Sequence, residues 1–253
     1  MSLLGKIVTR EQVVQRVVPM RQTATYQPIQ NGDFLDMLEN VADSMGLALE
    51  EPRFGLAREG QRMFGVYKVL GKNHFDGAVE LMLGVRNAFD GSISAGICFG
   101  STVMVCENLV FTGYAGENGV AGRAFHRHVT KVKTPSLVPR LRDRIEGALA
   151  QVDAFVKVQN DFYTHLQNTE IDNNMASDVI IQTARQNVIP KKDILDISNE
   201  WLNPQHEDFK DRNAWSLYNA FTEHGKAWTD RNLVSGSQRL MDVTKHFRTQ
   251  FAN

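Results

Sequence analysis

The sequence is poor in cysteine and has no long apolar run. Only Cys98 and Cys106 are present, which excludes the disulfide framework of small secreted proteins. The longest apolar runs are far shorter than the ~20 residues that a membrane-spanning helix needs. The N-terminus becomes charged at Lys6 and shows no cleavage site of small residues, so we expect no secretory signal. These absences predict a protein of a reducing cytoplasm with no membrane association.

A catalytic or metal-binding signature is also missing. His126 and His128 alternate on a predicted strand, but no Cys, Asp or Glu follows closely enough to complete a metal site. Cys106 follows an apolar strand and is interpreted as a buried side chain, not a nucleophile. Asn219, Glu223 and His224 share one predicted helix, with Asn219 and Glu223 one turn apart. They lack the further partners that a catalytic set requires. We therefore expect no enzyme, no metal and no cofactor.

The net charge is close to zero, at −1, and the isoelectric point is about 6.7, but the charge is unevenly distributed. Residues 121–144 contain seven basic side chains and one acidic side chain, Asp143. Because the Debye length at physiological salt is about 8 Å, acidic residues elsewhere do not cancel such a cluster. This basic segment can therefore bind an anion or a polyanion. Its basic residues are Arg123, Arg127, Lys131, Lys133, Arg140, Arg142 and Arg144.

Short apolar runs between turn residues predict an antiparallel sheet of about five or six strands over residues 47–133. Residues 47–70 alternate and are interrupted at Glu59-Gly60, which predicts a hairpin. Another run, Thr102 to Cys106, follows Gly100-Ser101, where we expect a second reversal or a bulge.

The centre of the predicted sheet is a turn between two apolar runs, Val79 to Val85 and Ile93 to Phe99. Asn87, Asp90 and Ser92 lie between these runs, and such side chains hold turns by hydrogen bonds to nearby backbone groups. We therefore predict that these three residues fix the turn structurally.

Helical periodicity covers most of the remaining chain. Asn31 or Asp33 can cap a helix that Gly46 ends, and the apolar spacing from Pro135 to about Asn168 predicts one long helix or two in line. Four further helices are predicted at 174–187, 191–202, 211–228 and 236–250. We expect their core to contain Trp201, Trp215, Leu217, Tyr218, Phe221 and Trp228.

The predicted fold class is α+β, with the antiparallel sheet followed by a long helix and a helical C-terminal half. We expect three parts: an N-terminal arm (1–30), a core of sheet and long helix (31–168), and a helical C-terminal part packed on that core (169–253).

Several segments carry a resemblance to a known family. The run LMLGVRNAFDGSISAGICFGSTVMVCENLVFTG, the Arg-His segment after it and then WSLYNAFTEHGK resemble, in content and order, the phage- and plasmid-encoded family catalogued as domain of unknown function 932. The segments TYQPIQNGDFLDMLENVADSMGLAL and GLAREGQRMFGVYKV resemble its helix and hairpin, so the likeness covers about residues 20–230. The family turn usually reads Asn-Ser-His/Tyr-Asp-x-Ser; here Ala88 and Phe89 depart from it. These departures exclude a hydroxyl or imidazole role at the two positions.

The resemblance implies a context, namely replication, recombination, packaging or evasion of host defence in a bacterial cytoplasm, and no agreed activity. One hypothesis is a protein that binds and anneals single-stranded nucleic acid, because a curved antiparallel sheet followed by a long helix is also the arrangement of phage annealing proteins. The contacts would come from Arg123, Phe125, His126, Arg127, Lys131, Lys133 and Arg140.

The alternative hypothesis is a protein-binding inhibitor of a host anti-phage defence system, without enzymatic activity. The near-neutral isoelectric point favours this alternative, since dedicated nucleic-acid binders are more often strongly basic. The expected partners are therefore single-stranded DNA or a host defence protein, and a homo-oligomer is left open.

Overall fold

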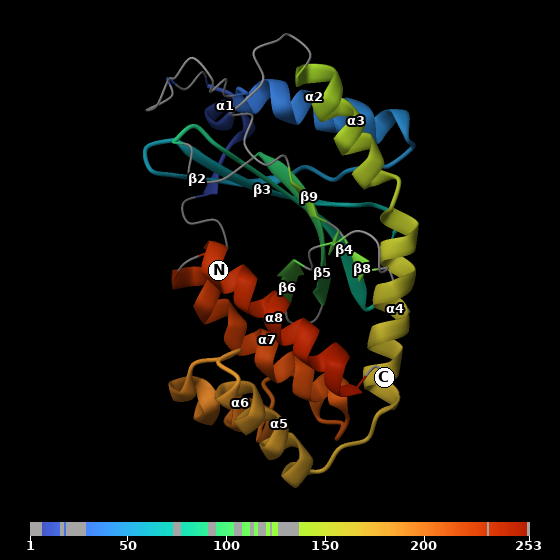
Figure 1. Cartoon of the computed structure of the whole chain (residues 1–253), viewed down its shortest axis with the longest axis vertical. Coiled ribbons are helices and arrows are strands. Elements are labelled where there is room, and N and C mark those ends of the chain that lie inside the picture. The colour runs from blue at the N-terminus through green and yellow to red at the C-terminus, as the bar shows by residue number, and fades with distance from the viewer. Residues whose placement is uncertain are drawn as a thin grey trace. The chain divides into compact units, whose positions relative to one another are not determined.

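The fold is α+β, as the sequence predicts: antiparallel strands dominate the first half of the chain and helices follow (Figure 1). The computed structural model describes residues 7–15, 18, 29–72, 77–90, 95–103, 108–111, 114–115, 120–121, 123–125, 137–231 and 233–251. Within these ranges only the backbone is described for residues 103–140, 229–231, 233–235 and 237–238.

The chain divides into two compact units that do not follow its order. The first unit contains residues 1–72, 81–100 and 113–155, and the second contains residues 73–80, 101–112 and 156–253. The three-part division expected from the sequence stays a prediction.

The main sheet has seven strands in the order β1-β2-β3-β4-β5-β6, and β9 pairs with β5. The registers described are antiparallel. A separate two-stranded sheet is formed by β7 (Tyr114–Ala115) and β8 (Val120–Ala121). The strands of the main sheet are β1 (Ile7–Val8), β2 (Arg53–Ala57), β3 (Arg62–Lys68), β4 (Val79–Ala88), β5 (Gly96–Val103), β6 (Asn108–Phe111) and β9 (Arg123–Phe125).

The predicted β2–β3 hairpin is confirmed, and its turn explains its sequence. Arg58, Glu59 and Gly60 all have positive φ, which glycine adopts freely and other residues adopt at a cost. Gly65 in β3 pairs with Phe54 of β2 on one side and with Val85 of β4 on the other. A Cβ on Gly65 would lie 2.6 Å from the Phe54 ring, so the close approach of the two strands requires glycine here.

Of the two expectations for Gly100-Ser101, the reversal is wrong, because β5 runs without interruption from Gly96 to Val103, and the bulge stays a prediction. Gly and Ser favour turns in exposed chain, but here both residues are buried in the strand. The Ser101 hydroxyl hydrogen-bonds to the hydroxyl of Tyr163. This buried bond gives the serine a role inside the strand that its turn propensity did not indicate.

Helices α2 (Asn31–Ser44) and α3 (Leu137–Leu149) lie side by side on one face of the sheet in the first unit (Figure 1). In α2, Phe34, Leu35, Leu38, Val41 and Ala42 are buried at helical spacing. The short α1 (Arg10–Val13) starts with a Thr9–Gln12 capping box. Arg10 then binds Asp36 and Glu39 of α2 at 2.6 Å each.

The second unit is mainly helical, and its predicted aromatic core is confirmed. Trp201, Trp215, Tyr218, Phe221 and Trp228 are buried in one cluster. The elements are α4 (Val152–Asn168), α5 (Asn173–Arg185), η1 (Lys191–Asp193), α6 (Ile194–Leu202), η2 (Glu207–Phe209), α7 (Ala214–Arg231) and α8 (Leu233–Phe251).

The predicted long helix is present as two helices, α3 and α4, separated at Ala150 and Gln151. In α3, Leu141, Ile145 and Leu149 are buried one turn apart. Among the helices described, none combines the length and the apolarity that crossing a bilayer requires.

Candidate functional site

Two of the residues predicted to contact nucleic acid lie in β9 at the edge of β5. Arg123 pairs with Cys98 and Phe125 with Gly96, so the strand that begins the basic segment is part of the main sheet. His126, Arg127, Lys131 and Lys133 lie outside the described residues. Their role stays a prediction.

The basic segment continues into α3, which contacts β9 in the first unit. Arg140 lies in the first turn of α3, and that turn contains no acidic residue. In the next turn the side chains of Arg142 and Arg144 are exposed. The partial positive charge of a helix N-terminus acts mainly within the first turn, so Arg140 is disfavoured there unless a negative charge lies nearby.

A small pocket lies where α3 packs against β5 of the sheet. It is lined by Leu141, Arg144 and Ile145 of α3, together with Gly96 and Ile97 of β5. These two β5 residues are the ones paired with Phe125 and Ala124 of β9. The two described ends of the basic segment, separated in sequence, are therefore brought to one edge of the sheet.

Asn87, predicted as a turn residue, lies inside β4 and is buried. Its Nδ2 donates to the backbone oxygen of Ile29 at 2.8 Å and to Oδ1 of Asn31 at 3.0 Å. Its Oδ1 accepts from the backbone N–H of Ala88 at 3.0 Å. Asn31 in turn donates to the backbone oxygen of Val13 at 3.2 Å. The two asparagines connect β4, the start of α2 and the end of α1.

Asp90 lies just after β4 and accepts a hydrogen bond from Nε of Arg62 in β3 at 2.8 Å. Nη1 of Arg58, from the β2–β3 turn, is 3.7 Å from the same carboxylate oxygen. This buried carboxylate therefore joins the ends of neighbouring strands through charge-assisted contacts. Ser92 lies outside the described residues, and the shared role of the three residues in the turn stays a prediction.

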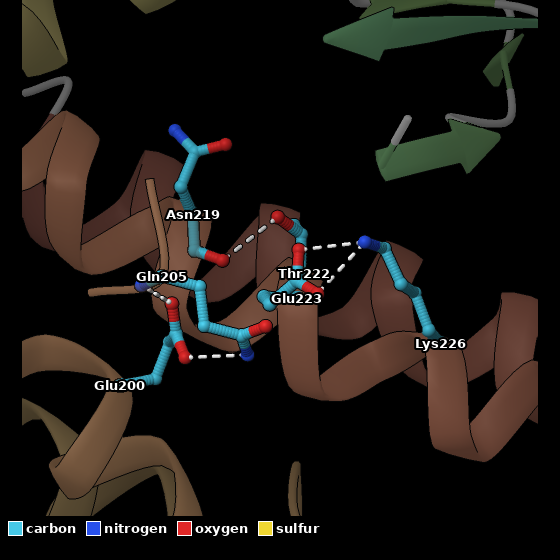
Figure 2. A network of polar contacts seen from close by, with 6 residues as sticks. All are labelled: Glu200, Gln205, Asn219, Thr222, Glu223 and Lys226. Atoms are coloured by element: carbon cyan, nitrogen blue, oxygen red, sulfur yellow. Dashed lines mark hydrogen bonds and ion pairs between the residues drawn. The ribbon is translucent and has the colours of Figure 1, made fainter. Parts of the chain in front are cut away.

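A second polar arrangement lies on α7, within the WSLYNAFTEHGK segment. Figure 2 shows Asn219, Thr222, Glu223 and Lys226 along this helix. Thr222 Oγ1 donates to the backbone oxygen of Asn219 at 3.1 Å, and Lys226 Nζ donates to both carboxylate oxygens of Glu223 at 2.7 Å. Asn219 is 1% exposed, and its Nδ2 donates to the backbone oxygen of Trp215.

Two buried atoms on α7 find no hydrogen-bond partner among the described residues, Oδ1 of Asn219 and Oγ of Ser216. Leaving a buried polar atom unpaired costs about 1–3 kcal/mol, so these two atoms are destabilising unless a further partner reaches them. The sequence signal was the spacing of Ser216, Asn219 and Glu223, three and four residues apart, which puts them on one helix face. Spacing gave no indication of their burial.

A third arrangement that sequence reasoning missed joins the α6 region to α7. Asp193 is buried, and its Oδ2 accepts a hydrogen bond from Nε1 of Trp228 at 2.7 Å. The same oxygen lies 3.4 Å from Nε2 of His224. Nδ1 of His224 lies 4.0 Å from Oδ2 of Asp196. These residues come from segments about 30 positions apart in the sequence, so no local motif identifies them.

Two basic groups of α8 are enclosed by the helical unit. Arg248 donates to Oε1 of Gln159 at 3.1 Å and lies 4.1 Å above the ring centre of Phe162, and burial lowers the pKa of its guanidinium. His246 is buried with Nε2 unpaired among the described residues, and burial lowers the pKa of its imidazole. Both groups favour the neutral form more than they would in water.

Comparison with known proteins gives one family match. The sequence model of the family described as domain of unknown function (DUF932) matches residues 21–240, which is most of the chain. The comparison with curated proteins finds no match, and neither does the comparison with solved structures.

Proposed function

This chain belongs to the family described as a domain of unknown function (DUF932), and we propose that it is a phage- or plasmid-encoded accessory protein that binds single-stranded nucleic acid. The activity would serve recombination or replication in the bacterial cytoplasm, including the annealing of complementary strands. The proposed activity is binding, without a catalytic step. The observation that carries it is the contact between β9 and α3.

This contact supports the proposal because it brings together two elements that contain basic residues from separate parts of the sequence. Arg123 lies in β9, and Arg140, Arg142 and Arg144 lie in α3. The helix N-terminus adds its own partial positive charge. A phosphodiester backbone provides a row of negative charges for such an edge, and the counterions that it releases drive binding.

The proposal also predicts how the interaction depends on sequence and salt. Contacts to phosphates do not distinguish one base from another, and an aromatic side chain such as Phe125 can stack on any base. The preference among nucleic-acid sequences should therefore be weak. For single strands the slope of log affinity against log salt is about −0.7 per phosphate neutralised, so five contacts would give roughly −3.5.

The test is fluorescence anisotropy with a labelled single-stranded oligonucleotide at several salt concentrations. Relative to the wild type, the Arg127→Ala, Lys131→Ala, Lys133→Ala triple variant should weaken binding and reduce the magnitude of the salt slope by about 2. A matched control removes three exposed positive charges outside the segment, by Arg185→Ala, Lys191→Ala and Lys192→Ala, and should leave the slope unchanged.

Absence of binding by the wild type at about 50 mM salt, where electrostatic attraction is strong, would refute nucleic-acid binding. Equal losses in the triple variant and the control would refute the assignment to the basic segment, since net charge alone would then explain the affinity.

A specific observation favours the protein-binding alternative, an inhibitor of a host anti-phage defence system. Helices α5 and α6 contact each other and expose large apolar side chains, namely Met175, Ile181, Leu195 and Leu202. Exposed apolar groups on neighbouring helices are typical of protein interfaces. A pull-down from phage- or plasmid-bearing cells separates the two functions: a partner retained after nuclease treatment, and lost in a Leu195→Ser variant, would favour the inhibitor.

A further inference from the structure

Three side chains of metal-ligand type converge between the start of α6 and the middle of α7. Asp193 ends η1, Asp196 lies in the first turn of α6, and His224 lies in α7. One ligand atom of each lies within 4.8 Å of the other two. We infer that Asp193, Asp196 and His224 form a binding site for a divalent transition-metal ion, which joins α6 to α7.

The distances fit a shared ion better than a direct ion pair. Nε2 of His224 lies 3.4 Å from Oδ2 of Asp193, and Nδ1 lies 4.0 Å from Oδ2 of Asp196. Only one of these nitrogens can bind a given ion, and the ligand atoms of the three residues lie within 4.8 Å of one another. A charge-assisted hydrogen bond would be about 2.7–2.9 Å long. Two ligand atoms at about 2.1 Å from one tetrahedral ion are separated by about 3.4 Å.

The burial of Asp193 is a second, independent reason to expect a cation. Its side chain is 5% exposed, and among the described residues no lysine or arginine pairs with it. A buried carboxylate without a cationic partner is costly. The guanidinium of Arg239 in α8 lies over the ring of Trp228, 5.4 Å from the ring centre.

Trp228 holds two of the three groups in position. Its Nε1 donates to Oδ2 of Asp193 at 2.7 Å. Its ring packs edge to face against the imidazole of His224, with centroids 5.4 Å apart and planes at 80°. Hydrogen bonds from a second layer of residues orient metal ligands and tune their affinity, so Trp228 is a positioning residue in this site.

The donor set selects the class of ion. One imidazole nitrogen with two carboxylate oxygens suits Zn²⁺, Mn²⁺ or Co²⁺, whereas Mg²⁺ and Ca²⁺ prefer oxygen ligands alone. Asp196 is 65% exposed, so water can reach the ion and complete its coordination. The expected effect is structural, because the ion would connect helices from two segments of the second unit. The site is independent of the nucleic-acid proposal, since none of its residues belongs to the basic segment.

The test uses untagged, full-length protein stripped with EDTA and titrated with Zn²⁺ by calorimetry and with Co²⁺ by visible absorption. We expect one ion per chain and a higher thermal midpoint in its presence. Asp196→Asn and His224→Gln should each weaken binding at least tenfold, and Trp228→Phe, which removes the N–H donor and replaces the indole with a smaller ring, should weaken it about 10- to 100-fold. Asp178→Asn, at an exposed carboxylate of α5, is the matched control and should bind as the wild type does.

The proposal is overturned if neither ion binds saturably up to about 1 mM, the weak end of specific association. It is also overturned if binding survives Asp196→Asn and His224→Gln unchanged.

Discussion

The buried pair Asn31 and Asn87 offers a quantitative test of what holds the first unit together. Asn87→Ala removes the donor to the Ile29 carbonyl, the donor to Asn31 Oδ1 and the acceptor for the Ala88 N–H. Asn31→Ala removes the bond to the Val13 carbonyl and the bond shared with Asn87. Both changes leave buried polar groups without a partner, so the loss exceeds that expected for an exposed asparagine.

A typical buried hydrogen bond contributes about 1 kcal/mol net, which gives about 3 kcal/mol for Asn87→Ala and about 2 kcal/mol for Asn31→Ala. Because the bond between the two side chains can be lost only once, the double variant should lose about 4 kcal/mol, so the coupling energy is about 1 kcal/mol. For a chain of this size the Asn87→Ala loss corresponds to a decrease in Tm of roughly 6–12 °C.

The assay is urea unfolding followed by circular dichroism, for the two single variants and the double variant. Asn40→Ala, at an exposed asparagine of α2, is the control and should stay within about 0.5 kcal/mol of the wild type. If Asn87→Ala behaved like Asn40→Ala, or if the losses of the single variants simply added, the hydrogen-bond account of this pair would be wrong.

Two further predictions concern charged groups. Asp90→Ala should destabilise the protein by about 1–3 kcal/mol, because Arg62 loses a charge-assisted partner; Asp90→Asn should cost less, and an unchanged Tm with lost binding would instead make Asp90 a functional residue. For His246, burial lowers the folded-state pKa below the unfolded value of about 6.5, so the unfolded chain binds more protons. Its contribution is fully present above about pH 6.5 and is lost as the pH falls toward the folded pKa. His246→Gln should therefore flatten the stability curve below about pH 6.5; an identical slope in both proteins would contradict this.

Local patterns predicted the elements that depend on neighbours in the sequence. The β2–β3 hairpin follows from alternation and from glycine at the turn, and α2 follows from apolar residues at helical spacing that end before Gly46. The aromatic residues of α6 and α7 were placed in the core correctly because their spacing matches the buried face of a helix. These signals lie within about twenty residues and need no knowledge of distant partners.

The features that the sequence did not predict depend on distant partners. Asn31 looks like a helix cap, but the N-cap of α2 is Gln30, and the Asn31 side chain is used by Asn87 and Val13. Gly100 and Ser101 look like a turn, yet Tyr163 provides the Ser101 hydroxyl with a partner inside the unit. The contact between Asp193 and His224, 3.4 Å between Oδ2 and Nε2, likewise joins residues that are far apart in the sequence. Side-chain chemistry indicated that these residues make specific contacts, but not with which partners.

The alternation of the chain between its two units has a consequence for how the protein can be made and altered. The boundaries at 80/81, 100/101 and 155/156 fall inside β4, β5 and α4. No single cut therefore releases either unit, and residues 156–253 alone would lack Val79 of their own apolar cluster. On the ribosome, Val79 emerges well before the helices of its apolar cluster, so it stays exposed until late in synthesis. The two units cannot be exchanged between proteins as separate modules, and variation must preserve both at once.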